Sequence, residues 1–291
     1  MTLQAAIRLG LLLSIWLMVL SLGARASLAT AGSVLRRPRQ LVPAITAMFV
    51  AVPAFAVLLA WAAPIPSAVK FAIVAMSVGP APPVLPFKQM KAGGDDDYPI
   101  GLLVAASLAS VLLTPGLVAA AARLIGADAE VDALQIARTL LLTIGAPLVA
   151  GMVLKATLPR LAQGFSEIAQ RVGSLVLLAG FVAILAASWR EILELLGDGA
   201  ALAIAATVAV GLLAGHLLAG PRHRAALALA AASRHPGVAL AIAAASYPDQ
   251  RRPIMAAILL YLLVTALVTA AYLRWANGRE PLTPAGQPAD S

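Results

Sequence analysis

The sequence predicts an all-α polytopic membrane protein of about nine transmembrane helices, with two inverted repeats and two broken, crossing helices. Of its 291 residues, 61% are hydrophobic and 12% are charged, whereas soluble domains carry about twice that share of charge. The mean hydropathy is +0.92. The apolar runs are continuous rather than alternating, which indicates helices and not a β-barrel. Two of these runs are interrupted at their centres by proline and glycine.

The nine expected spans are residues 4–23, 41–62, 68–90, 98–122, 134–154, 172–188, 200–219, 225–245 and 254–275. We expect loops at residues 24–40, 155–171 and 189–199, and a disordered polar tail at 276–291. The first span could instead be a signal peptide, because Arg8 precedes an apolar run and Ala24-Arg25-Ala26 resembles a cleavage site. We expect it to be retained, because its apolar run is long for a signal peptide.

The centre of the eighth span holds a polar interruption, Ser233-Arg234-His235-Pro236-Gly237. Pro236 has no N–H, so the carbonyl of Ala232 loses its helical partner. A charged residue at mid-bilayer costs roughly 3 kcal/mol on insertion scales and faces a cavity or a partner. These five residues are therefore the first candidates for a substrate site. The alternative is a simple proline kink in which Arg234 pairs with another helix or reaches the interface.

The third span is interrupted in the same way, by Gly79, Pro80, Pro82 and Pro83. These prolines cannot all lie inside one helix. When spans one to four are paired with spans six to nine, the broken span is third in each set and the two sets have opposite orientations. We therefore predict a single domain, 1–291, in which 4–122 is a repeat lacking its first helix and 134–275 is the second repeat. Matching broken helices in two halves indicate a transporter site.

Several short motifs support one resemblance: Pro80, the Gly-rich acidic run 91–95, Thr114-Pro115 and the segment 236–241. Together with the layout, they resemble the bile acid–sodium symporter family, within the bile, arsenite and riboflavin transporter superfamily. The resemblance implies two inverted five-helix repeats with broken helices that cross near the centre. This chain would be a divergent nine-span bacterial member.

The resemblance also implies places for sodium ligands, and this chain departs from the family at each of them. The family has a Ser-Asn pair in the first broken helix, a Glu and a later Gln-Asn in the second, and a Gln in the preceding core helix. At these places stand Leu85, Pro86, Ala230, Arg234, His235 and Met48. Sodium requires oxygen ligands, which leucine, alanine and methionine side chains lack. We therefore do not expect the family's sodium sites, nor any other metal or cofactor.

These residues predict a secondary transporter that moves a small organic anion by alternating access. Arg234 could hold the broken helices together or attract an anion through bidentate bonds, and His235 leaves proton coupling open. Ser107, Ser110 and Thr114 share one face of the fourth span, where they line the cavity or bond across helices. The alternatives are a sodium-coupled symporter and a non-transporting membrane sensor. An enzyme is not expected, because no Asp or Glu lies in a span core.

The distribution of charge predicts the orientation in the membrane. Most of the 21 Lys and Arg residues lie in the loops after spans one, three, five and seven and in the tail. The positive-inside rule then places the N-terminus outside and the C-terminus in the cytoplasm, with anionic lipid rather than nucleic acid as the partner. Abundant Ala and a preference for Arg over Lys are typical of a GC-rich bacterial genome, and hence of an inner-membrane location. The absence of Cys excludes disulfides and thiolate chemistry.

Overall fold

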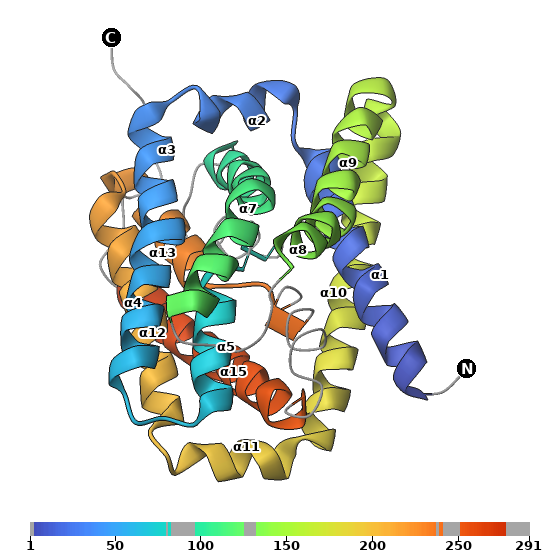
Figure 1. Ribbon diagram of the computed structural model, residues 1–291. Coiled ribbons are helices and arrows are strands. Elements are labelled where there is room, and N and C mark those ends of the chain that lie inside the picture. Colours follow the sequence, from blue (N-terminus) through green and yellow to red (C-terminus); the bar gives the residue numbers. More distant parts are fainter. Residues whose placement is uncertain are drawn as a thin grey trace.

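The described part of the chain is almost entirely helical. The computed structural model describes residues 3–79, 81–82, 97–124, 132–236, 239–240 and 251–277, and no strand occurs within these ranges. Figure 1 shows two groups of helices, joined by α2 (Leu28–Leu35) at one end of the molecule and by α11 (Trp189–Leu196) at the other. The all-helical prediction is confirmed.

The smaller group packs around three helices, α1 (Leu3–Arg25), α9 (Ala146–Thr157) and α10 (Pro159–Ala187). Glycines allow α1 and α9 to approach each other closely. A Cβ on Gly23 would clash with the carbonyl oxygen of Leu148, and one on Gly151 would clash with that of Leu20. The backbones of α1 and α9 are therefore in direct contact, as small residues permit in membrane helix pairs.

The larger group contains the two interrupted helices. It consists of α3 (Pro38–Ile45), η1 (Thr46–Ala51) and α4 (Val52–Ala62) in one continuous rod, with α5 (Ser67–Ser77), α7 (Asp97–Leu124), α12 (Ala200–Leu218), α13 (Arg224–Ala232) and α15 (Arg251–Asn277). Helix α12 packs against α13, α15 and the α4 rod, while α5 packs against α15. The main hydrophobic core of the molecule lies largely among these helices.

Among the described residues, six helices are long and apolar enough to cross a membrane: Pro38–Ala62, Tyr98–Ala121, Ala133–Thr157, Pro159–Ala187, Ala200–Leu218 and Arg252–Ala276. Two shorter apolar helices are Leu9–Arg25 and Ser67–Ser77. The multi-pass character is thus confirmed. The count of nine spans and the inverted repeats stay predictions, because the described parts of the third and eighth spans are short helices that stop at the interruptions.

Three expected loops contain helices, so these predictions were wrong. Residues 24–40 include α2, and residues 189–199 include α11, which crosses the lower end of the molecule in Figure 1. The predicted loop 155–171 belongs mostly to α10, which begins at Pro159, a favourable residue for a first helical turn. Charged residues occur within α11 and in the first turns of α10, whereas those of residues 24–40 lie beside α2 and not in it. The expected tail from 278 onward lies outside the described residues.

Two of the long helical segments, Pro38–Ala62 and Ala133–Thr157, contain a short π-helical stretch that is followed by a proline. In the first, η1, the N–H of Val52 bonds to the carbonyl of Ala47, five residues earlier. The second is η2 (Leu141–Gly145), between α8 (Ala133–Leu140) and α9, where the N–H of Ala146 bonds to the carbonyl of Leu141. The next N–H in each series is missing, because positions 53 and 147 are prolines.

Candidate functional site

The first interruption follows directly from its prolines. Helix α5 ends at Ser77, and Val78, Gly79, Ala81 and Pro82 lie outside any helix. In a continuous helix the carbonyls of residues 76, 78 and 79 would bond to residues 80, 82 and 83. All three of these positions are prolines without an N–H. The segment therefore carries three carbonyl oxygens that need donors from elsewhere.

Each of these oxygens has a described donor. The carbonyl of Met76 accepts a 3.1 Å bond from the N–H of Gly79. The carbonyl of Val78 accepts a 2.8 Å bond from the hydroxyl of Thr114 on α7. The carbonyl of Gly79 accepts a 3.2 Å bond from Nη1 of Arg234. Two of the three donors are side chains from distant parts of the chain, so the break is tied to α7 and to the second interruption.

The second interruption is the segment after α13. This helix ends at Ala232, and Ser233 has an extended backbone with φ −95° and ψ 129°. Arg234 and His235 are also non-helical, and both are buried, with exposed fractions of 2% and 5%. Pro236 denies the carbonyl of Ala232 its helical partner, as expected. A buried charge is thereby placed on a turn between helices.

The two interruptions touch. A Cβ built on Gly79 would lie 3.1 Å from the carbonyl oxygen of His235, so a larger residue there would crowd the second break. Nη2 of Arg234 donates a 2.6 Å bond to the carbonyl of Met48. Met48 stands five residues before Pro53, so its carbonyl is the one left without a partner when the π-helical series ends. One guanidinium thus joins η1 and both interruptions.

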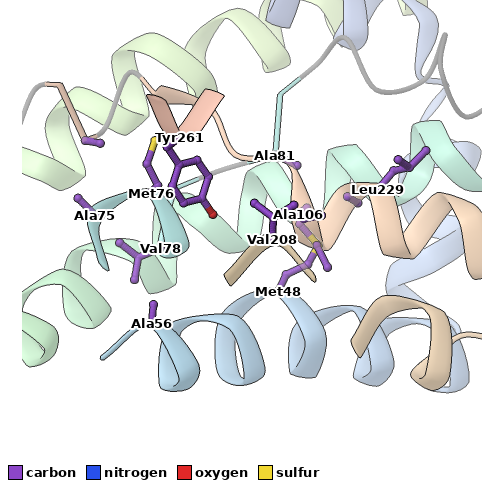
Figure 2. Packing of buried hydrophobic residues seen from close by; sticks show 14 of the residues in the cluster. Met48, Ala56, Ala75, Met76, Val78, Ala81, Ala106, Val208, Leu229 and Tyr261 are labelled. Carbon is purple, nitrogen blue, oxygen red and sulfur yellow. The ribbon is translucent and has the colours of Figure 1, made fainter. Parts of the chain in front are cut away.

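The charge of Arg234 has no acidic partner in the described ranges. The ion pair described there is Glu167–Arg171, at 3.8 Å on the exposed surface of α10. Nε of Arg234 is buried without a hydrogen-bond partner among the described residues. Tyr261 on α15 is buried in the same core, and Figure 2 shows it with Met48 among the buried residues. A positive charge therefore lies inside the larger helix group with no compensating carboxylate among the described residues.

The sequence-predicted residues differ in how close the structure brings them. Arg234, Gly79, His235 and the backbone of Met48 meet, and Thr114 joins them through Val78. Ser110 donates to the carbonyl of Ser107 on its own helix, and no described contact links either serine to Arg234. Pro82, Ser233 and Pro236 lie in or beside the breaks. Pro80, Pro83 and Gly237 are outside the described residues.

Sequence reasoning missed two contributors. It selected Met48 for its side chain, whereas the carbonyl oxygen makes the contact, and Pro53 was the available signal. It also did not select Tyr261, a buried tyrosine of the ninth span that belongs to the surrounding core. Four of the sodium-ligand positions lie in the described ranges and bring no side-chain oxygen to the site: Met48, Ala230, Arg234 and His235. Leu85 and Pro86 are outside those ranges.

Interrupted membrane helices that meet at a buried charge are typical of membrane transporters. The family comparison agrees with this class. The model of the Sodium Bile acid symporter family matches residues 12–196, well over half of the chain, and the chain belongs to this family. Its members are membrane transporters and not enzymes. The matched range includes η1 and the first break and ends before the second. No curated protein matches the chain.

Proposed function

We propose that this protein is a secondary transporter that carries a small organic anion by alternating access, without sodium. The observation that supports it is the buried guanidinium of Arg234, which contacts two carbonyl oxygens and no described carboxylate. Carbonyl dipoles solvate the charge but do not neutralise it. An anion that binds beside Arg234 would neutralise it, with the remaining N–H groups as charge-assisted donors.

The sign of this charge decides between classes of solute. At about 4 Å and an effective dielectric constant of about 20, two unit charges interact by roughly 4 kcal/mol. An anion gains that energy beside Arg234, whereas a sodium ion would lose it. A difference of this size corresponds to about a thousandfold in affinity for each ion. Both the preference for an anion and the loss of sodium binding therefore have the same cause.

Alternating access requires two bodies that move against each other. Close backbone contacts between α1 and α9 support a rigid smaller group, and those between α12 and α13 support a rigid larger group. Helices α2 and α11 join the groups at opposite ends. We propose that the groups rock about these connections while the solute stays near the crossing of the two breaks.

Uptake into proteoliposomes tests the proposal. A panel of labelled small carboxylates, such as acetate, pyruvate and succinate, would be offered with a sodium gradient, a proton gradient or a choline control. We expect at least one carboxylate to enter without sodium. A proton-gradient dependence that is lost in His235→Asn would assign the coupling to His235.

The matched variants are Arg234→Ala and Arg171→Ala, since Arg171 is exposed on α10. We expect Arg234→Ala to reduce uptake at least tenfold and Arg171→Ala to leave it unchanged. Uptake that strictly requires sodium would instead select the sodium-coupled symporter. Tight ligand binding without flux would select a membrane sensor, and full uptake by Arg234→Ala would exclude the anion site described here.

A further inference from the structure

The two carbonyl oxygens that contact Arg234 belong to separate elements, and proline frees both of them. The Met48 carbonyl is left over at the end of η1 because of Pro53, and the Gly79 carbonyl because of Pro83. They lie 2.6 Å and 3.2 Å from Nη2 and Nη1 of the same guanidinium. Without Arg234, these two carbonyl oxygens would be buried with no described hydrogen-bond donor, which is energetically costly.

Converging backbone oxygens are a common way to hold a cation in a membrane protein, where unwound carbonyls at broken helices serve as ligands. In this chain the cation is covalently attached. Its charge is buried, with an exposed fraction of 2% for the residue, and the described ranges contain no carboxylate beside it. The arrangement is therefore that of a cation site whose occupant is part of the chain.

We propose that Arg234 is a tethered cation that closes a carbonyl-lined site between η1 and the two breaks, and that the site binds free guanidinium ion when the side chain is removed. A planar guanidinium can reproduce the forked N–H donation to both carbonyls. A sodium ion would find only two described oxygens, far fewer than a hard cation requires. The selectivity expected of the vacated site is therefore guanidinium over sodium.

The same geometry predicts a mechanical role. Arg234 lies in the second interruption and bonds to the carbonyl of Met48 in η1 and to that of Gly79 in the first interruption. Neither oxygen has a helical hydrogen bond of its own, so removing Arg234 should loosen η1 and both interruptions together. Restoring a guanidinium restores both bonds, although not the covalent link to α13. The stabilisation by the free ion should then follow simple binding to the folded state, increasing with the logarithm of its concentration above the dissociation constant.

The experiment is a thermal-shift titration of the purified full-length protein in nanodiscs, with no organic anion present. Guanidinium chloride would be added at low, non-denaturing concentrations, with sodium chloride, choline chloride and urea as matched controls. We expect Arg234→Ala to melt several degrees below the wild type and to regain on the order of 3 °C with guanidinium. We expect wild type and Arg171→Ala to show no increase with any of these additives.

Two outcomes would overturn the proposal: no increase of the Tm of Arg234→Ala with guanidinium, or an equal increase in wild type and Arg171→Ala. Stabilisation by sodium in place of guanidinium would also overturn it. If Arg234→Ala does not fold, Arg234→Lys and Arg234→Gln decide instead. The retained charge should leave the Tm of the Lys variant several degrees above that of the neutral Gln variant, and an equal or lower Tm would refute the tethered cation. The proposal does not depend on the solute, since uptake tests that separately.

Discussion

Pro53 acts on the site through a residue five positions earlier. The π-helical series of η1 reaches the carbonyl of Met48 just where the next N–H is missing, and Arg234 supplies the donor. The same event occurs in η2, where Pro147 leaves the carbonyl of Leu142 without a partner, and Nε1 of Trp16 donates to it at 3.2 Å. In both cases a side chain from a distant part of the chain replaces the missing backbone N–H: Arg234 from the second interruption and Trp16 from α1.

This parallel gives a matched pair of substitutions, Pro53→Ala and Pro147→Ala. Alanine restores a backbone N–H that can bond to the freed carbonyl of the same helix, Met48 or Leu142. The side chain that bonded to this carbonyl, Arg234 or Trp16, then loses its acceptor. We expect Pro53→Ala to destabilise by about 2 kcal/mol, since it leaves a buried charged donor unsatisfied. Pro147→Ala should cost less than about 1 kcal/mol, because Trp16 is neutral and 39% exposed. Chemical or thermal unfolding in nanodiscs measures both, and equal losses would contradict the assignment of Met48 to Arg234.

At the scale of elements, the broken helix α13 is positioned by close contact with α12. A Cβ on Gly215 would clash with the backbone of Ala228, and one on Gly211 would lie 2.9 Å from the carbonyl of Ala231. Glycine is required at these positions because the two backbones meet there. Since α13 leads directly to Ser233, this contact also sets where the second interruption lies.

Gly215→Ala should therefore separate α12 from α13 and displace Arg234. We expect a loss of about 1–3 kcal/mol in stability, typical of overpacking, together with reduced carboxylate uptake. The control is Gly116→Ala on α7, where a Cβ would meet nothing within 4 Å and helix propensity favours alanine by up to about 1 kcal/mol. A Gly215→Ala protein as stable and active as Gly116→Ala would show that the close contact does not position the site.

Helices α11 and α10 show why some elements escaped sequence reasoning. In α11, Ile192 and Leu195 are buried while Trp189 and Leu193 are about half exposed. The eight residues of α11 include Arg and Glu, and their sequence predicts a loop. A helix this short has no long apolar run by which it could be recognised. Likewise, α10 has 29 residues, about 43 Å at 1.5 Å per residue. It exceeds the roughly 30 Å hydrocarbon layer, so its charged first turns resemble a loop.

At the scale of the whole molecule, the connections alternate between the two ends. Figure 1 shows α2 and the junction of α9 and α10 at one end, with α11 and the turn between α4 and α5 at the other. This alternation is what a multi-pass bundle requires. The ends were assigned to membrane sides from the distribution of Lys and Arg, and that assignment remains a prediction.

The absence of Cys permits a direct test of orientation by single-cysteine labelling. Asp198, beyond α11, and Arg222, between α12 and α13, are both exposed and lie on opposite sides of α12 in the sequence. In intact cells, we expect a membrane-impermeant maleimide to label Asp198→Cys, and to label Arg222→Cys only after permeabilisation. Solubilised protein should label at both positions. The reverse pattern in intact cells would invert the proposed topology.

The sequence by itself determined the membrane class, the helical content, the two interruptions and the residue that carries the buried charge. Composition and proline positions are local properties, so they can be recognised without coordinates. The tertiary structure decided which oxygens Arg234 contacts, because a freed carbonyl takes whichever donor the packing brings within about 3 Å. It also decided that Thr114 reaches the first break while Ser110 donates to the carbonyl of Ser107 within α7. The partners of Arg234 lie far from it in sequence, and the close packing of α12 with α13 brings them together. No local sequence pattern specifies this packing.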